Sequence, residues 1–507
     1  MPEVESNNKR IAKNTLFLYI RMIFIMLINL FTSRVILQAL GVDDYGIYNV
    51  VGGFVAMFGI LSNSLSAAIT RFLTFELGTG DKDKLKKIFS SSVTIQVVIS
   101  LIILLLIECF GVWFVNNKML IEPDRYVAAN WVLQLSMLTF CVNVISVPYN
   151  ALIIAHERMV AFAWISVLES CLKLGICFLV MISPVDRLIA YATLLALVAL
   201  FIRLIYGVYC RRNFGESEYH FYFDKKLFKQ LFAFSGWNFI GAGSGVLRDQ
   251  GVNILINLFW GTAVNASRGI ALQVSAAVTS FSSSFITALN PQITKLYASK
   301  EYNSCFQLVT QGARFSFYLL LLISLPVFLE TPILLRTWLT IVPDYTIVFV
   351  RLILLYVMIE SLSYTMITLM LATGNIRNYQ IIVGGLQLLN FPISYMLLKL
   401  GYEPECTIVV SIIIAIICLF VRLYMLNRMA GISIGDFIHK VVVNIIIVAC
   451  VGSILPLLVV IYFNEGYLRL VLTIIVSSIS LIFTCLSVGC SSGERYFLKQ
   501  KIKERLR

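Results

Sequence analysis

The sequence predicts an all-α integral membrane protein that crosses the bilayer about fourteen times. Three observations carry this prediction. Hydrophobic residues make up 59% of the 507 residues and charged residues only 13%, whereas a soluble chain carries about 25% charged residues. Apolar stretches of roughly 20 residues, the length needed to span a bilayer, recur with short connections. Basic residues concentrate in alternate connections, which is typical of a polytopic helical protein.

Each apolar stretch is bounded by a connection that contains charged residues, Pro or Gly, and this places the elements in order. The expected spans are 14 to 40, 46 to 77, 88 to 115, 126 to 155, 159 to 182, 187 to 210, 229 to 259, 263 to 298, 304 to 330, 346 to 373, 377 to 399, 406 to 427, 438 to 463 and 467 to 489. The longest connection, 211 to 228, is charged and aromatic and is expected to lie partly at the membrane surface. No connection could hold a separate folded domain, so we expect one helical bundle.

Lys and Arg residues in the connections set the expected orientation. With the N-terminus in the cytoplasm, the outer connections carry only a few basic residues: Lys118, Arg125, Arg187, Arg336, Lys399 and Arg469. The inner connections and the basic tail carry most of the others, so both termini are predicted to be cytoplasmic. This bias explains much of the net charge of +13, which therefore gives no support to nucleic-acid binding. The tail is expected to lie on anionic membrane lipids.

Cysteine and histidine do not form a recognisable site in the sequence. The eleven cysteines lie singly, without a C-x-x-C pair, and the three histidines are far apart. This spacing predicts neither disulfides nor a metal site. The chain also lacks the G-x-x-x-x-G-K-S/T phosphate loop. We expect no cofactor and no catalytic residue.

The chain matches itself weakly at a shift of 220 residues. "GVDDYGIYNV" from Gly41 aligns with "GTAVNASRGI" from Gly261, and Asp81, Pro123 and Asp124 align with Glu301, Pro343 and Asp344. An even number of spans separates the matched segments, so the halves are expected to be parallel repeats, which are common in transporters. The alternative is a duplication kept for stability in a receptor or scaffold.

The repeat predicts four parts of the chain. Residues 1–210 form an N-terminal lobe of six helices, 211–228 a cytoplasmic linker, 229–430 a C-terminal lobe of six helices, and 431–507 two further helices with the basic tail. In parallel repeats of this kind the substrate site is expected between the lobes, near the middle of the membrane.

Several charged residues fall inside the expected spans, where each costs about 2.5 to 3.5 kcal/mol at the bilayer centre. Arg203, Arg351 and Arg422 lie near span ends and can extend their charge to the interface. Glu169 and Lys173 have the i, i+4 spacing of an intrahelical ion pair. The candidates for ion pairing, or for coupling transport to an ion, are Glu169, Lys173, Asp249 and Glu360.

Four arginines are harder to explain structurally: Arg21 and Arg34 in the first span, Arg248 in the seventh and Arg314 in the ninth. The first span contains no carboxylate, and the first and seventh spans are equivalent in the two repeats. We therefore expect a cationic, water-filled cavity between the lobes whose ligand is an anion. Asp249 is either a partner that holds Arg248 or a proton-binding group.

Four segments resemble a known family. They are "LQALGVDDYGIYNVVGGF" from Leu37, "ITRFLTFELGTGD" from Ile69, "DQGVNILINLFWGTAVNASRGIALQVSAAV" from Asp249 and "ALNPQITKLYAS" from Ala288. They resemble bacterial polysaccharide biosynthesis transporters, the O-antigen repeat-unit flippases of the multidrug/oligosaccharidyl-lipid/polysaccharide flippase superfamily. The resemblance extends along the whole chain.

The resemblance implies a fold similar to that of multidrug and toxic compound extrusion transporters. It implies a substrate that is an oligosaccharide on undecaprenyl diphosphate, moved across the bacterial inner membrane for lipopolysaccharide, capsule or exopolysaccharide synthesis. Polysaccharide polymerase and glycosyltransferases would be its pathway partners. By position in the motifs, Arg71 and Arg268 would lie on the substrate path, although anchoring of helix ends is the alternative role.

Two other functions are alternatives to a flippase. A cation-coupled multidrug exporter has the same fold, but it is expected to need a carboxylate in the first span, where this chain has arginine. A membrane glycosyltransferase, polymerase or ligase is the enzyme alternative. Polymerases and ligases are expected to carry a large outer loop, which this chain lacks.

Overall fold

The computed structural model describes residues 22–59, 81–156, 158–220, 245–339, 341–373 and 377–491, together with short pieces between 62 and 77 and near 243 and 494. These residues are almost entirely helical, and the described part of the chain contains no strand. An all-helical architecture is expected in lipid, because a helix satisfies its own backbone hydrogen bonds without water. The predicted fold class is confirmed.

Eleven helical segments of the described residues are long and apolar enough to cross a membrane. They are Met22–Leu40, Lys82–Asn117, Pro123–Ala155, Val160–Met181, Arg187–Asn213, Tyr302–Leu329, Thr346–Ala372, Arg377–Lys399, Cys406–Ala430, Ile434–Tyr462 and Tyr467–Gly489. Each corresponds to a predicted span. The other three predicted spans contain α2 (Val42–Ala56), α10 (Val252–Trp260) and α11 (Thr262–Ala298), so the count of fourteen is consistent with the structure.

The chain divides into two compact units. Unit 1 comprises Met1–Gly269, Leu339–Asp344 and Phe391–Pro404, and unit 2 comprises Ile270–Trp338, Tyr345–Asn390 and Glu405–Arg507. Unit 1 thus takes in α10 and the first residues of α11. The lobe boundaries at residues 210, 228 and 430 were drawn from the sequence repeat and stay a prediction.

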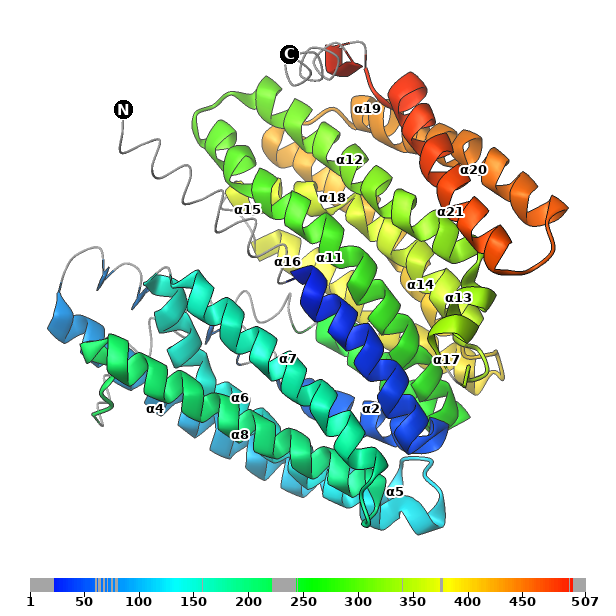
Figure 1. Ribbon diagram of the computed structural model, residues 1–507. Helices are drawn as coiled ribbons and strands as arrows, with labels where there is room; N and C mark the ends of the chain where they lie inside the picture. Colours follow the sequence, from blue (N-terminus) through cyan, green and yellow to red (C-terminus); the bar gives the residue numbers. More distant parts are fainter. Residues whose placement is uncertain are drawn as a thin grey trace, which may run out of the picture. The chain divides into compact units, whose positions relative to one another are not determined.

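Unit 1 is built around α6 (Tyr126–Ala155). This helix packs against α4 (Lys82–Leu106), α8 (Arg187–Asn213) and α2, and Figure 1 shows α4, α6 and α8 lying along one another. Leucine, isoleucine and phenylalanine side chains fill the space between them, including the fully buried Phe89 and Leu133. The remaining elements of the bundle are η1 (Ile107–Gly111), α5 (Val112–Asn117), η2 (Pro123–Arg125), α7 (Met159–Met181) and η3 (Gly215–Ser217).

One arginine joins three elements of unit 1. The Nε of Arg125, in η2, donates to Asp44 Oδ1 at 2.8 Å, and its Nη1 donates to Asp186 Oδ2 at 2.7 Å. Asp44 lies in the first turn of α2, and Asp186 is the N-cap of α8. Burial opposes ionisation of Asp186, but hydrogen bonds from the Ile189 N–H and from Arg125 outweigh it and hold its pKa below the ordinary value.

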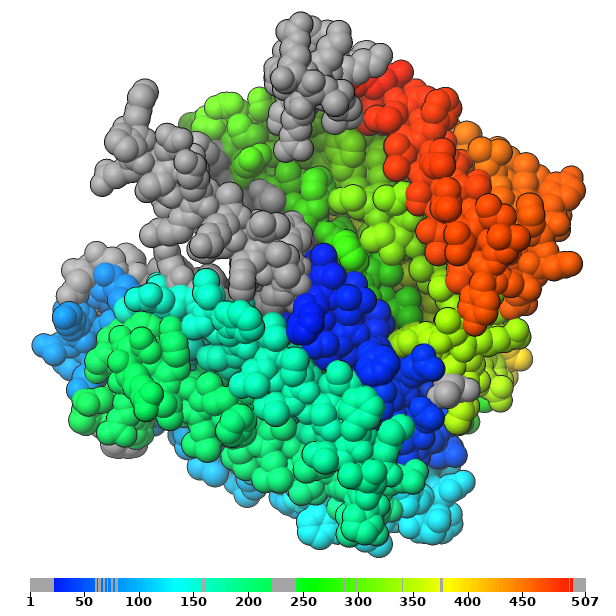
Figure 2. Space-filling model, in the orientation of Figure 1, coloured from blue at the N-terminus to red at the C-terminus, as the bar shows by residue number. Residues whose placement is uncertain are grey.

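Unit 2 is built around α12 (Tyr302–Leu329), which packs against α14 (Thr346–Ser361), α20 (Asn444–Tyr462) and α21 (Tyr467–Thr484). The pair α20 and α21 forms one margin of this unit, coloured orange and red in Figure 2. Many apolar side chains of this pair are exposed. The other elements are α11 from Ile270 onward, α13 (Thr331–Trp338), α15 (Tyr364–Ala372), α16 (Arg377–Leu388), α18 (Cys406–Ala430), α19 (Ile434–Phe437), η5 (Ile438–Val443) and η6 (Cys485–Gly489). Helix α17 (Asn390–Lys399) belongs to unit 1 from Phe391 onward.

A buried carboxylate attaches α21 to the rest of unit 2. Glu330, at the end of α12, is 0% exposed and accepts hydrogen bonds from Arg469 Nη2 at 2.8 Å and Thr473 Oγ1 at 2.9 Å. An isolated buried charge is costly, and removal of one partner from such a pair costs about 3 to 5 kcal/mol. Arg469 neutralises Glu330 and Thr473 donates a hydrogen bond to it, and these contacts hold the C-terminal helix pair in place.

We expect Arg469→Met to lower the thermal unfolding temperature of the detergent-purified protein clearly, because Glu330 would lose its counter-charge. Arg336→Met is the matched control. Arg336 pairs with Glu465 at 3.1 Å, but this pair is 69% and 42% exposed, and exposed pairs contribute about 0 to 1 kcal/mol. Equal unfolding temperatures for the two variants would contradict the role assigned to Glu330.

Candidate functional site

Arg248 and Asp249 lie in a π-helical turn, η4 (Leu247–Gly251), which leads directly into α10. Arg248 Nε donates to Asp249 Oδ1 at 2.9 Å and Arg248 Nη2 donates to Oδ2 at 3.3 Å. The Arg248 side chain is 15% exposed and that of Asp249 is 47% exposed. Two hydrogen bonds thus orient the guanidinium, and π-helical turns inside α-helices are frequent at functional sites.

Arg268 belongs to the same cluster, although α11 supplies it. Its side chain is buried, and Nη2 donates to the backbone oxygen of Asp249 at 3.1 Å. A widened turn leaves backbone carbonyls that need donors from elsewhere, and a guanidinium can supply them. Arg248, Asp249 and Arg268, which were predicted separately from the sequence, are therefore brought together by the fold of unit 1.

Three asparagines support this cluster, and none of them was among the candidate site residues taken from the sequence. Asn265 Nδ2 donates to Asn253 Oδ1 at 2.7 Å, and Asn253 Nδ2 donates to the backbone oxygen of Asn49 at 3.2 Å. These residues come from α11, α10 and α2 respectively, and Asn253 and Asn265 are buried. Asparagine commonly joins helices by hydrogen bonds inside membranes. The available signal was the presence of asparagine in otherwise apolar spans.

Helix α2 approaches the start of α11 closely at Gly46. A Cβ atom at Gly46 would lie 2.0 Å from the backbone oxygen of Thr262, so the two backbones are in direct contact. Small residues allow this kind of approach between membrane helices. Gly46 thereby sets the spacing of α2 and α11, and the asparagine bonds depend on that spacing.

The other predicted residues of unit 1 lie in separate places. Arg34 is half-buried in the helix Met22–Leu40, which contacts α7 through Phe31 and Phe178 at a ring distance of 6.5 Å. Glu169 and Lys173 form the expected pair within α7, at 2.6 Å. Arg21 and Arg71 lie outside the described residues.

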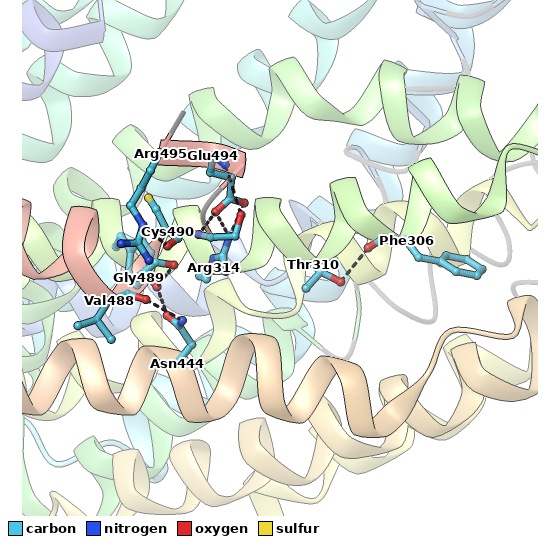
Figure 3. A network of polar contacts seen from close by, with 11 residues as sticks. Phe306, Thr310, Arg314, Asn444, Val488, Gly489, Cys490, Glu494 and Arg495 are labelled. Atoms are coloured by element: carbon cyan, nitrogen blue, oxygen red, sulfur yellow. Dashed lines mark hydrogen bonds and ion pairs between the residues drawn. The ribbon is translucent and has the colours of Figure 1, made fainter. Parts of the chain in front are cut away.

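Unit 2 contains Arg314 and Glu360. Arg314, buried in α12, donates from Nη2 to both carboxylate oxygens of Glu494, at 2.5 and 2.6 Å (Figure 3). The pair borders a cavity of about 600 Å³ that Gln307, Thr310 and Lys440 also line. Glu360 is half-buried at the end of α14. Sequence reasoning missed Glu494 because it lies 180 residues from Arg314, in a basic tail.

Metal ligands do not converge in the described part of the chain: no three His, Cys, Asp or Glu side chains there could hold a metal ion. The described cluster around η4 consists instead of guanidinium, carboxylate and amide groups. Such groups bind polar and anionic ligands by charge-assisted hydrogen bonds.

Comparison with known proteins connects these features to a family. Residues 11–297 match the family model described as polysaccharide biosynthesis protein. The chain belongs to this family. The match covers more than half of the sequence and includes η4, α10 and nearly all of α11, so the cluster around Arg248 lies within the part shared with the family. No curated protein sequence matches the chain at a significant level.

Solved structures show the same fold at low sequence identity. Lipid II flippase MurJ in its inward closed conformation has a TM-score of 0.68 at 14% identity, over 92% of this chain and 97% of that one. An inward-facing multidrug resistance transporter of the MATE family has a TM-score of 0.67 at 11% identity, over 81% and 96%. A MATE transporter in complex with MaL6 has a TM-score of 0.61 at 12% identity, over 83% and 96%.

These likenesses confirm the predicted family resemblance and the flippase and MATE-like fold. The long apolar helices indicate a multi-pass membrane protein, and the solved structures that share its fold are a flippase and multidrug transporters. At these low sequence identities, the solved structures show a shared fold and nothing more specific. The substrate therefore has to be argued from the residues of this chain.

We expect Gly46→Ala to destabilise the protein, because the added methyl group would collide with the Thr262 backbone. Forced expansion of a packed contact typically costs about 1 to 3 kcal/mol. Gly52→Ala, in the same helix, is the control, since a Cβ there meets nothing within 4 Å. Thermal unfolding should separate the two, and a normal Gly46→Ala variant would show that the close contact is dispensable.

Proposed function

We propose that the protein flips undecaprenyl-diphosphate-linked oligosaccharide repeat units across the bacterial cytoplasmic membrane, with both of its termini in the cytoplasm. The product would enter lipopolysaccharide, capsule or exopolysaccharide synthesis, upstream of a polymerase and downstream of glycosyltransferases. Membership of the polysaccharide biosynthesis family supports the pathway. The cluster of Arg248, Asp249 and Arg268 is the observation that carries the substrate assignment.

The chemistry of a diphosphate suits this cluster. Arginine presents a planar fork of donors that can bind two phosphate oxygens at once, and it stays charged at every physiological pH. Arg248 is oriented by Asp249, whereas Arg268 is fixed against the η4 backbone. Two guanidiniums thus lie close together on η4 and α11, and guanidiniums bind anionic groups by charge-assisted hydrogen bonds.

Transport by alternating access fits the absence of a nucleotide-binding motif in the sequence. The polar head of the substrate would cross between the lobes while its lipid tail stays in the bilayer. Arg34 and Arg314, with Arg21 and Arg71 outside the described residues, are the further arginines proposed to lie on that path. The process would be driven by an ion gradient, the membrane potential or consumption of the product.

A cation-coupled multidrug exporter is the second candidate, because MATE transporters share the fold. Charge distinguishes the two functions. The helix Met22–Leu40 contains Arg34 and no carboxylate, whereas binding of a cation in that helix would require an acidic group. The two guanidiniums on η4 and α11 also favour an anionic substrate over a cationic drug.

Replacement of Arg248 by alanine should lower surface glycan export about tenfold or more, because the diphosphate loses a charge-assisted bidentate contact. Protein abundance in the membrane should not change, since Asp249 is half exposed to solvent and tolerates loss of its partner. The measurement is surface glycan in cells that depend on this protein, with membrane levels matched by immunoblot.

Arg336→Ala is the comparison variant, because it removes an arginine whose ion pair is exposed and lies in unit 2. It should leave glycan export normal. Normal export by Arg248→Ala at equal abundance would remove Arg248 from the substrate site. If Arg248→Ala altered the drug resistance of the cells but left their surface glycan unchanged, the exporter function would be favoured instead.

Asp249 is proposed to position Arg248 rather than to carry a proton, because its two oxygens accept from that guanidinium. Asp249→Asn keeps one acceptor oxygen and should therefore retain part of the activity, whereas Asp249→Ala should lose more. Transport by reconstituted protein across a range of pH tests this. The pH profile should keep its shape in Asp249→Asn, and a flat profile would identify Asp249 as the proton carrier.

A further inference from the structure

Besides the cavity beside Arg314 in unit 2, a cavity lies in unit 1 at the end of α8. None of the proposed substrate residues lines the cavity in unit 1. Its volume is about 630 Å³, and its walls include Tyr149 of α6, Arg203, Gly207 and Arg211 of α8, and Tyr219 and His220 after η3. Arg203 was explained in the sequence as a residue that extends its charge to the membrane interface. In the structure, the Arg203 side chain lines this cavity.

The guanidinium of Arg203 is held in a defined position. It stacks on the ring of Tyr149, with its central carbon 3.7 Å from the ring centroid. A Cβ atom at Gly207 would lie 3.0 Å from Arg203 Nη1, so the guanidinium passes directly over Gly207. It is therefore displaced about one helical turn, roughly 6 Å, toward Arg211. The two positive charges approach each other along α8.

The charge of this cavity is not balanced by its own carboxylate. Glu218 lines the cavity, but its Oε2 accepts from Lys86 Nζ at 3.2 Å. Among the described residues, no carboxylate forms an ion pair with Arg203 or Arg211. The arginine stacked on Tyr149 is thus available to an outside anion, and Arg211 is exposed at the same opening.

An apolar stripe on α8 begins at the cavity and continues along the helix. Leu204 and Val208 line the cavity and are exposed, and Phe201 and Leu197 are exposed on the same helical face. The spacing of three and four residues places these side chains above one another. Because α8 is long and apolar enough to span the membrane, this stripe would face lipid chains. A positively charged cavity at the end of such a stripe matches the two parts of a phospholipid.

We propose that this cavity binds the headgroup of an anionic phospholipid. Arg203 and Arg211 would donate to the phosphate oxygens, Tyr219 and His220 would border the headgroup, and an acyl chain would lie along Leu204 and Val208. Basic pockets at the cytoplasmic ends of membrane helices are suited to such headgroups. A soluble phosphate would satisfy the arginines but would leave the apolar stripe without a role.

The test is thermal unfolding of the purified full-length protein in a neutral detergent, titrated with phosphatidylglycerol, phosphatidylcholine or inorganic phosphate at constant ionic strength. Phosphatidylglycerol should raise the unfolding temperature at concentrations where the other two do not. The double variant Arg203→Gln/Arg211→Gln should weaken its apparent affinity about tenfold or more, because charge-assisted hydrogen bonds to the phosphate are lost.

Arg212→Gln is the matched control, because it removes the same charge from the neighbouring, exposed position that does not line the cavity. It should keep the wild-type affinity. Should the double variant fail to fold, Arg211→Gln alone, at an exposed position, is compared with Arg212→Gln by native mass spectrometry of bound phosphatidylglycerol. The proposal would be overturned if Arg211→Gln and Arg212→Gln lost bound phosphatidylglycerol equally, or if phosphatidylglycerol did not stabilise the wild-type protein. Stabilisation by inorganic phosphate at similar concentrations would assign the cavity to a soluble anion instead.

Discussion

The cost of an unpartnered charge in the bilayer is the constraint on which much of this structure depends. Each buried guanidinium or carboxylate has to meet an opposite charge, a polar group or water. Glu330 meets Arg469, and Arg314 meets Glu494. These pairs link segments that are distant in the sequence, so satisfying the charges also determines which helices of unit 2 are held together.

The same constraint acts in the η4 region. Asp249 accepts hydrogen bonds from Arg248, and Arg268 donates to a backbone carbonyl of the widened turn. Gly46 and the asparagines of α2, α10 and α11 keep these elements close enough for the cluster to form. The proposed anion site would therefore need little further ordering on binding, because these contacts already fix its geometry.

Arginine side chains would bind two different kinds of anion in this protein. In η4 and α11 it would meet the diphosphate of a transported lipid, and at the end of α8 it would meet the headgroup of a resident lipid. The surroundings separate the two cases. Asp249 and asparagine side chains surround the first group, whereas the second lies beside exposed leucine and valine side chains that suit an acyl chain.

The sequence by itself determined the helical class and most of the spans, because apolar length is a local property of the chain. The predicted spans 377 to 399 and 467 to 489 coincide with helical segments of the structure, and the Glu169–Lys173 pair followed from its spacing within one helix. Only the tertiary structure decided which distant groups meet. The partner of Arg314, the joining of Arg268 to η4, the asparagine network and the stacking of Arg203 on Tyr149 all depend on how helices pack. Packing is set by side-chain shape across the whole bundle, and hydropathy along one segment does not contain that information.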